Sequence, residues 1–468
     1  MQNPLLEIEQ RMLGDIYTSR EVMDNLEVLC DDCGSRWGGT EGERRAAAFL
    51  LERFREYGLV ECHLEPFSYT GWVRGPASLH VVAPVERSMP CISLPMSPPA
   101  TVQGELVYVG DGAPAEFAAV AERLPGGIAM VSSQPPRGLN RTVHRSEKYQ
   151  RSALGGAAVF LYTNQYAGYG PETGSIASDR EALIPGIAIA KEEGEMLLRL
   201  QRRHGPLTLR VETSDRTETM TSWNVVADLP GPVKADEWVL LGCHYDGHDI
   251  SQGAHDPASG TVALVEAARV LALHAGGSLG CGIRCVLFGI EEVGLTGARR
   301  YVDAHLHELD QIRLTLNLDS AGGAGPKGLL VNRWPQIEPL VERWATEMAA
   351  EVRVGQRTSA FSDHYPFFLE GVPTAMMGNP THVNTGRGFD HTAFDTLDKV
   401  HIGDLREAAA SAARLALRIS LEEPWPAKRR THEEVQALLA AEPSLEGQAV
   451  KEALEARYAE RDAQRSDA

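Results

Sequence analysis

The stretch from Trp238 to Gly260 constrains the fold of this chain more than any other. It begins with an unbroken apolar run that ends at His244. A strand covered on both faces needs continuous rather than alternating hydrophobicity, so this run predicts a buried strand of a parallel sheet. Asp256 follows, and the Ala/Val/Leu-rich segment behind it predicts a helix to about His274. Both polar side chains therefore belong near the carboxyl end of the strand, where open α/β sheets bind ligands.

The same alternation of strand and helix continues along the chain. Apolar runs at 283–290, 312–318 and 371–378 predict further strands, and residues 295–306 predict a helix between the first two. Strands that alternate with helices form a mainly parallel central sheet flanked by helices. The sequence therefore predicts an α/β fold.

The chain changes composition along its length. Prolines and glycines are frequent from about residue 76, and the short strand-like runs that follow predict an inserted β-rich domain. Near the end, Ala, Glu and Arg dominate, which predicts a solvent-facing or frayed helix. We therefore expect four parts: an N-terminal part of the main domain (1–90), the insert (91–215), the main domain (216–425) and a charged helical tail (426–468).

Charge and cysteine content exclude several classes of function. The formal net charge is −19, and no cluster of Lys and Arg interrupts it, so nucleic acid and anionic membrane surfaces are not expected partners. Seven scattered cysteines do not form a disulfide framework. The sequence as given contains no secretory signal and no long uncharged apolar window, so we expect a cytoplasmic protein.

Histidine and carboxylate side chains follow three of the predicted strands. His244 ends the first, Glu291 and Glu292 end the second, and Asp319 ends the third. Side by side, the carboxylates of this set would repel one another as anions unless a cation lay among them. Imidazole and carboxylate are ligands of zinc and related metals, and so many carboxylates commonly hold a pair of ions about 3.5–4 Å apart. This edge of the sheet is therefore a predicted metal site.

The spacing of these residues assigns two further roles. Adjacent residues at a strand end point to different sides, so Glu291 and Glu292 should not both bind metal, and one stays free as a base. Asp246 lies two residues beyond His244, on the same side of an extended chain. This position suits a carboxylate that holds the imidazole in one tautomer.

Six ordered segments resemble the co-catalytic zinc aminopeptidases, a family that also includes glutamate carboxypeptidases and the transferrin receptor. They are HYD at 244–246, GAHDPASG at 253–260, EEVGLTGA at 291–298, NLD at 317–319, SDHYPFF at 362–368 and HTAFDTLD at 391–398. The insert, with EKYQRSALGGAAVFLY and IPGIAIAKEEGEMLL, resembles a protease-associated domain, and HLEPFSYTGWVRG is similar to the plasma glutamate carboxypeptidase branch. The resemblance implies the α/β fold of zinc exopeptidases.

The resemblance also implies the site residues. It implies two zinc ions, with cobalt or manganese as alternatives, and the following ligands: His244 and Asp319 on one ion, Glu292 and His391 on the other, and Asp256 bridging the two. Glu291 would be the general base that takes a proton from the metal-activated water as it attacks the scissile carbonyl.

The chain departs from the family pattern at two positions. Pro257 follows the bridging aspartate where Asn or Asp is usual, and since a cis bond to proline costs only about 0.5–1 kcal/mol, we predict that Asp256–Pro257 is cis. Asp390 stands where many members have a tyrosine that donates to the oxyanion. Either another donor serves, with His364 and Tyr365 as the candidates, or the activity is weaker or different.

We expect an exopeptidase acting on peptides, and an aminopeptidase first. An aminopeptidase holds the substrate ammonium with a carboxylate, for which Asp363 and Asp390 are available, whereas a carboxypeptidase holds the terminal carboxylate with a cation such as Arg387. A carboxypeptidase or dipeptidase of the glutamate carboxypeptidase type is therefore the main alternative. Less favoured are a receptor-like binding protein and a glutaminyl cyclase-like acyltransferase with one zinc. Whether the chain forms a homodimer stays open.

Overall fold

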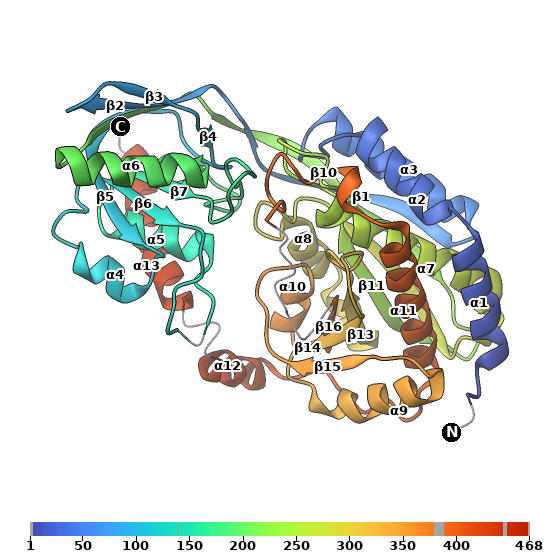
Figure 1. Cartoon of the computed structure of the whole chain (residues 1–468). Coiled ribbons are helices and arrows are strands. Elements are labelled where there is room, and N and C mark those ends of the chain that lie inside the picture. Colours follow the sequence, from blue (N-terminus) through green and yellow to red (C-terminus); the bar gives the residue numbers. More distant parts are fainter. Residues whose placement is uncertain (1–2, 140, 379–387, 443–446, 467–468) are drawn as a thin grey trace. The chain divides into compact units, whose positions relative to one another are not determined.

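The computed structural model describes residues 3–139, 141–378, 388–442 and 447–466 (Figure 1). The chain divides into two compact units. Unit 1 comprises Met1–Ser68, Thr221–Asp390 and Asp395–Ala441, and unit 2 comprises Tyr69–Met220, His391–Phe394 and Glu442–Ala468. Two long strands, β1 (Val60–Val73) and β10 (Arg216–Leu229), contribute residues to both units.

Unit 1 contains an eight-stranded sheet in the order β1-β10-β12-β11-β13-β16-β14-β15. Its other strands are β11 (Lys234–His244), β12 (Cys281–Phe288), β13 (Ile312–Asn317), β14 (Gly328–Val331), β15 (Arg353–Gln356) and β16 (Thr374–Gly378). β11 pairs in parallel with β12 and β13, and β13 pairs in parallel with β16. β10 is antiparallel to β12, and β14 is antiparallel to β16. The predicted α/β fold with a mainly parallel sheet is confirmed.

The helices of unit 1 cover both faces of this sheet. They are α1 (Leu6–Thr18), α2 (Glu21–Glu27), α3 (Glu41–Glu56), α7 (Gly260–His274), α8 (Thr296–Ala304), α9 (Glu338–Met348), α10 (His364–Leu369), α11 (Ile402–Leu421) and α12 (His432–Ala441). Val239 and Leu241 of β11 pack in the same cluster as α7 and α11, whereas Leu240 between them packs with α8 and α10. The continuous apolar run of β11 is thus explained, because each face of the strand meets helices.

Local sequence accounts for the helix ends. The Thr40 hydroxyl accepts a hydrogen bond from the Glu43 backbone N–H and caps α3, and acidic residues occupy the first turn of this helix. α3 ends at Glu56, and Gly58 with its φ of +84° follows the C-cap residue Tyr57. α7 is buried on almost every side, in keeping with its Ala/Val/Leu composition.

The topology of unit 1 brings three strand ends to one edge. β11, β12 and β13 are neighbours and run parallel, so their carboxyl ends meet at the same side of the sheet. His244 is the last residue of β11, and the turns that follow β12 and β13 carry Glu291 and Asp319. The predicted polar edge therefore exists.

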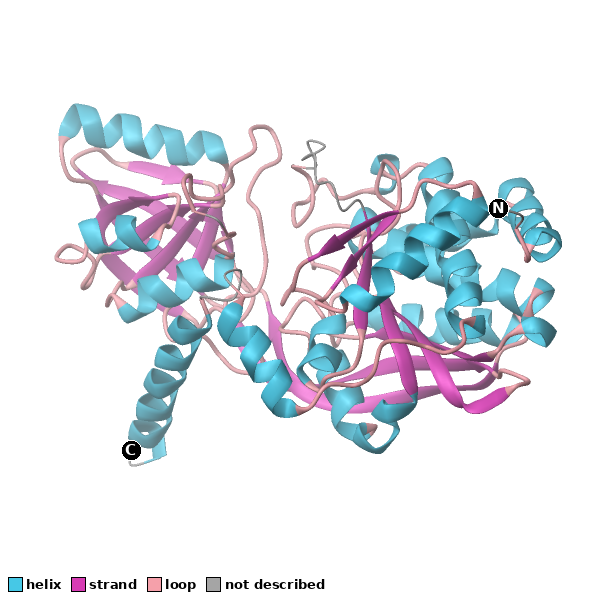
Figure 2. Cartoon of the chain, turned by 90° about the horizontal axis from the view of Figure 1, so that it is seen from below, coloured by secondary structure: helices cyan, strands magenta, loops and turns pink. Residues whose placement is uncertain are grey.

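Unit 2 contains a second eight-stranded sheet, in the order β3-β2-β9-β5-β6-β7-β8-β4, and Figure 2 shows the two sheets as separate groups of strands, each flanked by helices. Its further strands are β2 (Ala77–Ala83), β3 (Arg87–Met89), β4 (Ile92–Ser93), β5 (Ala100–Gly110), β6 (Ile128–Ser132), β7 (Val159–Thr163), β8 (Gly186–Ile189) and β9 (Thr208–Thr213). Its helices are α4 (Pro114–Ala119), α5 (Arg145–Leu154), α6 (Lys191–His204) and α13 (Gln448–Ser466). The β-rich segment expected in the middle of the chain is present, and its assignment as a protease-associated domain stays a prediction.

The end of the chain departs from expectation. The helical tail is present, but Leu454 and Tyr458 of α13 are buried in one cluster with Tyr149 of α5. The prediction of a solvent-facing or frayed helix is therefore wrong for this face of α13, because two apolar side chains among many charged ones suffice to dock it. Among the described residues, no helix is long and apolar enough to span a membrane.

Candidate metal centre

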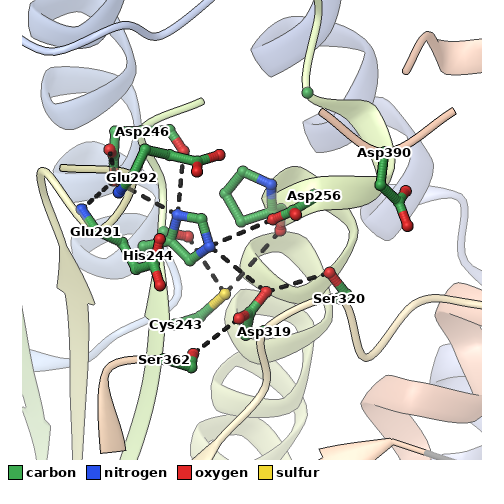
Figure 3. A network of polar contacts seen from close by, with 12 residues as sticks. Cys243, His244, Asp246, Asp256, Glu291, Glu292, Asp319, Ser320, Ser362 and Asp390 are labelled. Atoms are coloured by element: carbon green, nitrogen blue, oxygen red, sulfur yellow. Dashed lines mark hydrogen bonds and ion pairs between the residues drawn. The ribbon is translucent and has the colours of Figure 1, made fainter. Parts of the chain in front are cut away.

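His244 lies at the centre of a cluster of carboxylates at the edge of the unit 1 sheet (Figure 3). Its side chain is almost fully buried. Its Nε2 atom lies 3.4 Å from Oδ1 of Asp256 and 3.4 Å from Oδ1 of Asp319. His244, Glu291 and Asp319 each offer a ligand atom, and these atoms all lie within 4.8 Å of one another. Residues from four separate segments of the sequence thus converge on one point.

Asp246 organises the opposite side of the imidazole. Its Oδ1 lies 3.4 Å from Nδ1 of His244, and its backbone carbonyl lies 3.1 Å from the same nitrogen. The two carboxylate oxygens also accept the backbone N–H groups of Glu291 and Glu292, at 3.0 and 3.3 Å. The sequence placed Asp246 beside His244, but it gave no sign that this carboxylate also holds the turn after β12.

That turn has an unusual backbone. Ile290 has a φ of +59°, a region that β-branched residues rarely adopt. The conformation is held from both sides, because the Ile290 carbonyl accepts the Thr296 N–H at 2.8 Å and Asp246 accepts the N–H of the next residue. Backbone in such a rare region is often found at functional sites.

Asp319 is held by two hydroxyl groups. Ser362 donates to its Oδ2 at 2.7 Å, and Ser320 donates to its Oδ1 at 3.1 Å. Ser362 in turn accepts from the Asn317 side-chain amide at 2.7 Å. These supporting roles are not evident from the sequence, although Ser362 and Asn317 both belong to segments that carry the family resemblance.

Asp256 lies in a π-helical turn, Ala254–Ser259, that leads into α7. The Asp256–Pro257 peptide bond is cis, as predicted. Asp395, on the late loop, accepts the backbone N–H groups of His255 and Asp256 at 2.8 and 3.0 Å. Burial raises the pKa of Asp395 to about 6, although these two N–H groups act in the opposite direction. In the sequence, Asp395 stands out only as a member of the segment HTAFDTLD at 391–398.

The two adjacent glutamates have different neighbours. Glu291 groups with His244, whereas Oε2 of Glu292 lies 2.8 Å from Nε2 of His248. His248 also stacks on Trp37, with ring centroids 5.8 Å apart. The different surroundings suit the different roles expected for the two carboxylates.

Asp390 and His391 are adjacent in the sequence but belong to different units. Oδ1 of Asp390 lies 3.0 Å from Nδ1 of His255 in unit 1. His391 is counted with unit 2, where its carbonyl accepts the Thr173 N–H at 2.7 Å and its Nδ1 lies 3.5 Å from Arg145. Arg387 lies outside the described residues.

The remaining predicted residues lie at the start of α10 and are buried. Among the described residues, neither carboxylate oxygen of Asp363 has a hydrogen-bond partner. Nε2 of His364 lies 3.0 Å from the Ser359 carbonyl, and burial lowers the pKa of His364 to about 4. The Tyr365 ring stacks on Phe368 in the core. The structure thus shows backbone and core contacts for His364 and Tyr365.

The electrostatics of the cluster reflect crowded negative charge in a buried place. Burial lowers the pKa of His244, but Glu291 and the other carboxylates outweigh this effect and raise it well above its usual value. Burial raises the pKa of Glu291 well above its usual range, and Glu292 adds to the shift. Burial also raises the pKa of Asp363 well above its usual value, and the charge of Asp319 adds to this shift.

This donor set fits a divalent cation. It combines one buried imidazole with several carboxylates, which are the oxygen and nitrogen ligands that zinc accepts. The outer face of the imidazole and the far oxygen of Asp319 are each held by a neighbour, as is usual around metal ligands. His244, Asp256 and Asp319 would hold the ion, and no cysteine is needed.

Comparisons with known proteins agree with this geometry. Residues 224–416 match the model of peptidase family M28. Carboxypeptidase Q of Mus musculus is 29% identical over 324 residues, which cover 67% of this chain and 67% of that protein. Aminopeptidase YwaD of Bacillus subtilis (strain 168) is 28% identical over 407 residues, which cover 84% of this chain and 83% of that protein.

Solved structures show the same fold over most of the chain. A peptidase M28 precursor from Shewanella amazonensis SB2B has a TM-score of 0.76 at 23% identity, and the match covers 90% of this chain and 99% of that one. BSAP, a zinc aminopeptidase from Bacillus subtilis, has a TM-score of 0.66 at 24% identity. This match covers 88% of this chain and 97% of that one.

Proposed function

Since the chain belongs to peptidase family M28 and is a metallo-exopeptidase, we propose that it is a zinc aminopeptidase that removes amino-terminal residues from peptides. The observation that carries this proposal is the convergence of Asp256 and Asp319 on Nε2 of the buried His244, with Glu291 beside them. These are the side chains that the mechanism requires.

The proposal assigns two zinc ions to the site. His244 and Asp319 would hold one, Glu292 and His391 the other, and Asp256 would lie between them. Bound zinc supplies Lewis acidity, which lowers the pKa of a water ligand and stabilises the oxyanion of the transition state. The Ser362 hydroxyl on Oδ2 of Asp319 and the Asp246 carboxylate on Nδ1 of His244 support the idea, because each fixes its side chain from the side away from His244 Nε2. Ser320 donates to the other oxygen of Asp319, Oδ1, which lies 3.4 Å from His244 Nε2.

Glu291 is the proposed general base. It accepts the proton of the attacking water and then donates it to the leaving amine. Its burial and the neighbouring Glu292 raise its pKa, which favours a group that must hold a proton between two steps. Asp246 orients the backbone of Glu291 through the 3.0 Å hydrogen bond, so the base is held in place relative to His244.

One observation favours an aminopeptidase over a carboxypeptidase. Asp363 presents a buried carboxylate without a hydrogen-bond partner among the described residues, and a substrate ammonium would supply the missing charge and donors. The carboxypeptidase alternative depends on a cation such as Arg387.

Peptides blocked at one end test the proposal. An aminopeptidase cleaves a peptide with a free amine and an amidated carboxyl end, and it leaves the acetylated peptide with a free carboxylate intact. The reverse result would establish the carboxypeptidase alternative. Cleavage of neither peptide, with one zinc per chain and cyclisation of amino-terminal glutamine, would establish acyl transfer.

Glu291→Gln is the matching test of the base. We expect it to lower kcat by about 10²–10⁴-fold while zinc stays bound, because proton transfer is lost but the ligands remain. Glu266→Gln is the control, since Glu266 is a buried glutamate that pairs with Arg269 within α7. Full activity of Glu291→Gln would remove Glu291 from the mechanism.

A further inference from the structure

Arg36 is a fully buried cation next to the candidate metal centre, shortly after the π-helical turn Val28–Asp32. Its guanidinium donates hydrogen bonds to five backbone carbonyl oxygens: Tyr245 at 2.8 Å, Leu29 at 3.1 Å, Gly34 at 2.8 Å, Gln252 at 2.6 Å and Gly253 at 2.8 Å. A buried charge is stable only when its hydrogen bonds are satisfied, and here backbone dipoles satisfy it.

These acceptors join two distant parts of the chain. Three of them belong to the loop between His244 and Asp256, and the other two belong to the segment that carries Arg36 itself. The carbonyl of Arg36 also accepts the Gly247 N–H at 3.3 Å. Each end of this loop thus carries a proposed zinc ligand, and Arg36 binds the loop near both ends.

The loop fits closely around the guanidinium. Gly253 has a φ of +54°, and a Cβ there would lie 3.0 Å from Nη2 of Arg36 and 2.8 Å from the Asp256 carbonyl. A Cβ on Gly247 would lie 3.3 Å from the same Nη2. Larger residues at either position would push the loop away from the cation.

A second contact fixes the loop independently. The side-chain amide of Gln252 donates to Oδ1 of Asp31 at 2.8 Å, and its oxygen accepts the Leu397 N–H at 2.8 Å. The loop residues 245–253 contain no helix or strand, so their conformation depends on such side-chain contacts. Among these contacts, Arg36 makes the most hydrogen bonds to the loop.

We propose that Arg36 is a positioning residue that sets the geometry of the loop 245–253, and with it the distance between His244 and Asp256 and the zinc affinity of the site. This inference rests on the proposed function, since it assigns both residues to zinc. Arg36 does not touch the reacting atoms and acts through the loop. Without its donors, five backbone carbonyls, three of them in buried contacts, would lose a partner, and the loop would relax.

The test compares Arg36→Met with Arg313→Met. Arg313 is a matched control, because it is also buried and also donates to backbone carbonyls, those of Ile419, Ser420 and Glu422. It lies in β13 at the end far from Asp319. Zinc dissociation constants are measured by competition with a chelator, and amide hydrogen exchange is measured on the zinc-free proteins.

We expect Arg36→Met to weaken zinc binding about 10–100-fold and to speed amide exchange in residues 245–256, as is usual when support around a metal ligand is lost. Arg313→Met should lower Tm but leave both quantities unchanged. Arg36→Lys keeps the charge but has fewer donors, so it should give an intermediate zinc affinity. If Arg36→Met does not fold, zinc affinity and amide exchange are measured on Arg36→Lys instead.

Two results would overturn the inference. Unchanged zinc affinity and unchanged exchange in a folded Arg36 variant would show that the loop does not depend on the guanidinium. An equal effect of Arg313→Met would show that general loss of stability is the cause. If the wild-type chain binds no zinc, the proposed function fails, and the exchange measurement alone decides the role of Arg36.

Discussion

Asp246 connects the histidine and the two glutamates of the candidate metal centre. One carboxylate lies beside Nδ1 of His244 and accepts the backbone N–H groups of Glu291 and Glu292. A charged acceptor of this kind fixes the ring orientation and strengthens the imidazole as a ligand. At the scale of single residues, the site therefore depends on a group that is not expected to touch zinc.

Asp246→Asn tests this dependence. We expect zinc affinity to fall about 10–100-fold, because the amide keeps one acceptor oxygen but loses the charge and the second acceptor. The measurement is a chelator competition, with circular dichroism to confirm the fold. Asp228→Asn is the control, since Asp228 is a buried acid paired with Arg284. Equal zinc affinity in wild type and Asp246→Asn would contradict the assignment.

Glu43 gives the stability a pH dependence. Burial raises its pKa to about 8 from a usual 4.5, although Ser222 and the Gly39 N–H donate to the carboxylate and act against burial. The folded state binds the proton of the Glu43 carboxyl group more tightly than the unfolded state does. The stability that this protonated group contributes is therefore fully present below about pH 4.5. It is lost as the pH rises towards about 8.

We therefore expect Glu43→Gln to become more stable relative to wild type between pH 5 and pH 8. Urea unfolding of the zinc-free proteins at several pH values in this range measures the difference in free energy of unfolding. A difference that does not change with pH would show that Glu43 titrates normally in the folded protein.

At the scale of elements, the close approach of α7 to β13 sets the site. Gly260 begins α7, and a Cβ there would lie 2.1 Å from the carbonyl of Leu318, the residue before Asp319. The backbone of α7 fixes the position of this Cβ and the facing oxygen is a backbone carbonyl, so no side-chain rotation can relieve the contact. The glycine therefore allows the helix behind Asp256 to lie against the strand end that carries Asp319.

Gly260→Ala should separate the two elements. We expect a loss of about 1–3 kcal/mol in the free energy of unfolding, from overpacking, together with weaker zinc binding. The control is Gly403→Ala in α11, where a Cβ meets nothing within 4 Å and the substitution should stabilise by about 0.5–1 kcal/mol. Equal changes in the free energy of unfolding of the two variants would show that the close approach at Gly260 does not affect stability.

Helix α13 contributes to the core of unit 2. Tyr458 is buried against the cluster that contains Tyr149 of α5. Tyr458→Ala should cost about 3–5 kcal/mol, as for other large aromatic truncations. The neighbouring, exposed Arg457→Ala should change stability by less than about 0.5 kcal/mol. Thermal unfolding followed by calorimetry distinguishes the two, and equal Tm values would show that α13 is not part of the folded unit.

At the scale of the whole molecule, the strand-end residues were predictable because they depend on local sequence and on one topological rule. An apolar run followed by a histidine or an acid predicts a strand end, and parallel strands bring such ends together, as they do for His244, Glu291 and Asp319. The supporting residues were not predictable in this way. Arg36 lies 216 residues from Gln252 in the sequence, and only the tertiary fold brings them together.

The tail illustrates the same limit. Leu454 and Tyr458 are spaced four residues apart among charged side chains, so the sequence gives only a weak apolar stripe. Their burial depends on a complementary surface on α5, far away in the chain. Local patterns therefore predicted the helix, and the contacts made by its buried face required the structure.

The central claim is that side chains from separate strand ends hold zinc at one point. Anomalous scattering measured at the zinc edge, on crystals of zinc-loaded protein, tests it most directly. The account predicts two peaks, one of them about 2.0–2.2 Å from both His244 Nε2 and an Asp319 oxygen, with an Asp256 carboxylate between the two ions. Peaks elsewhere on the chain, with none beside His244, would contradict it.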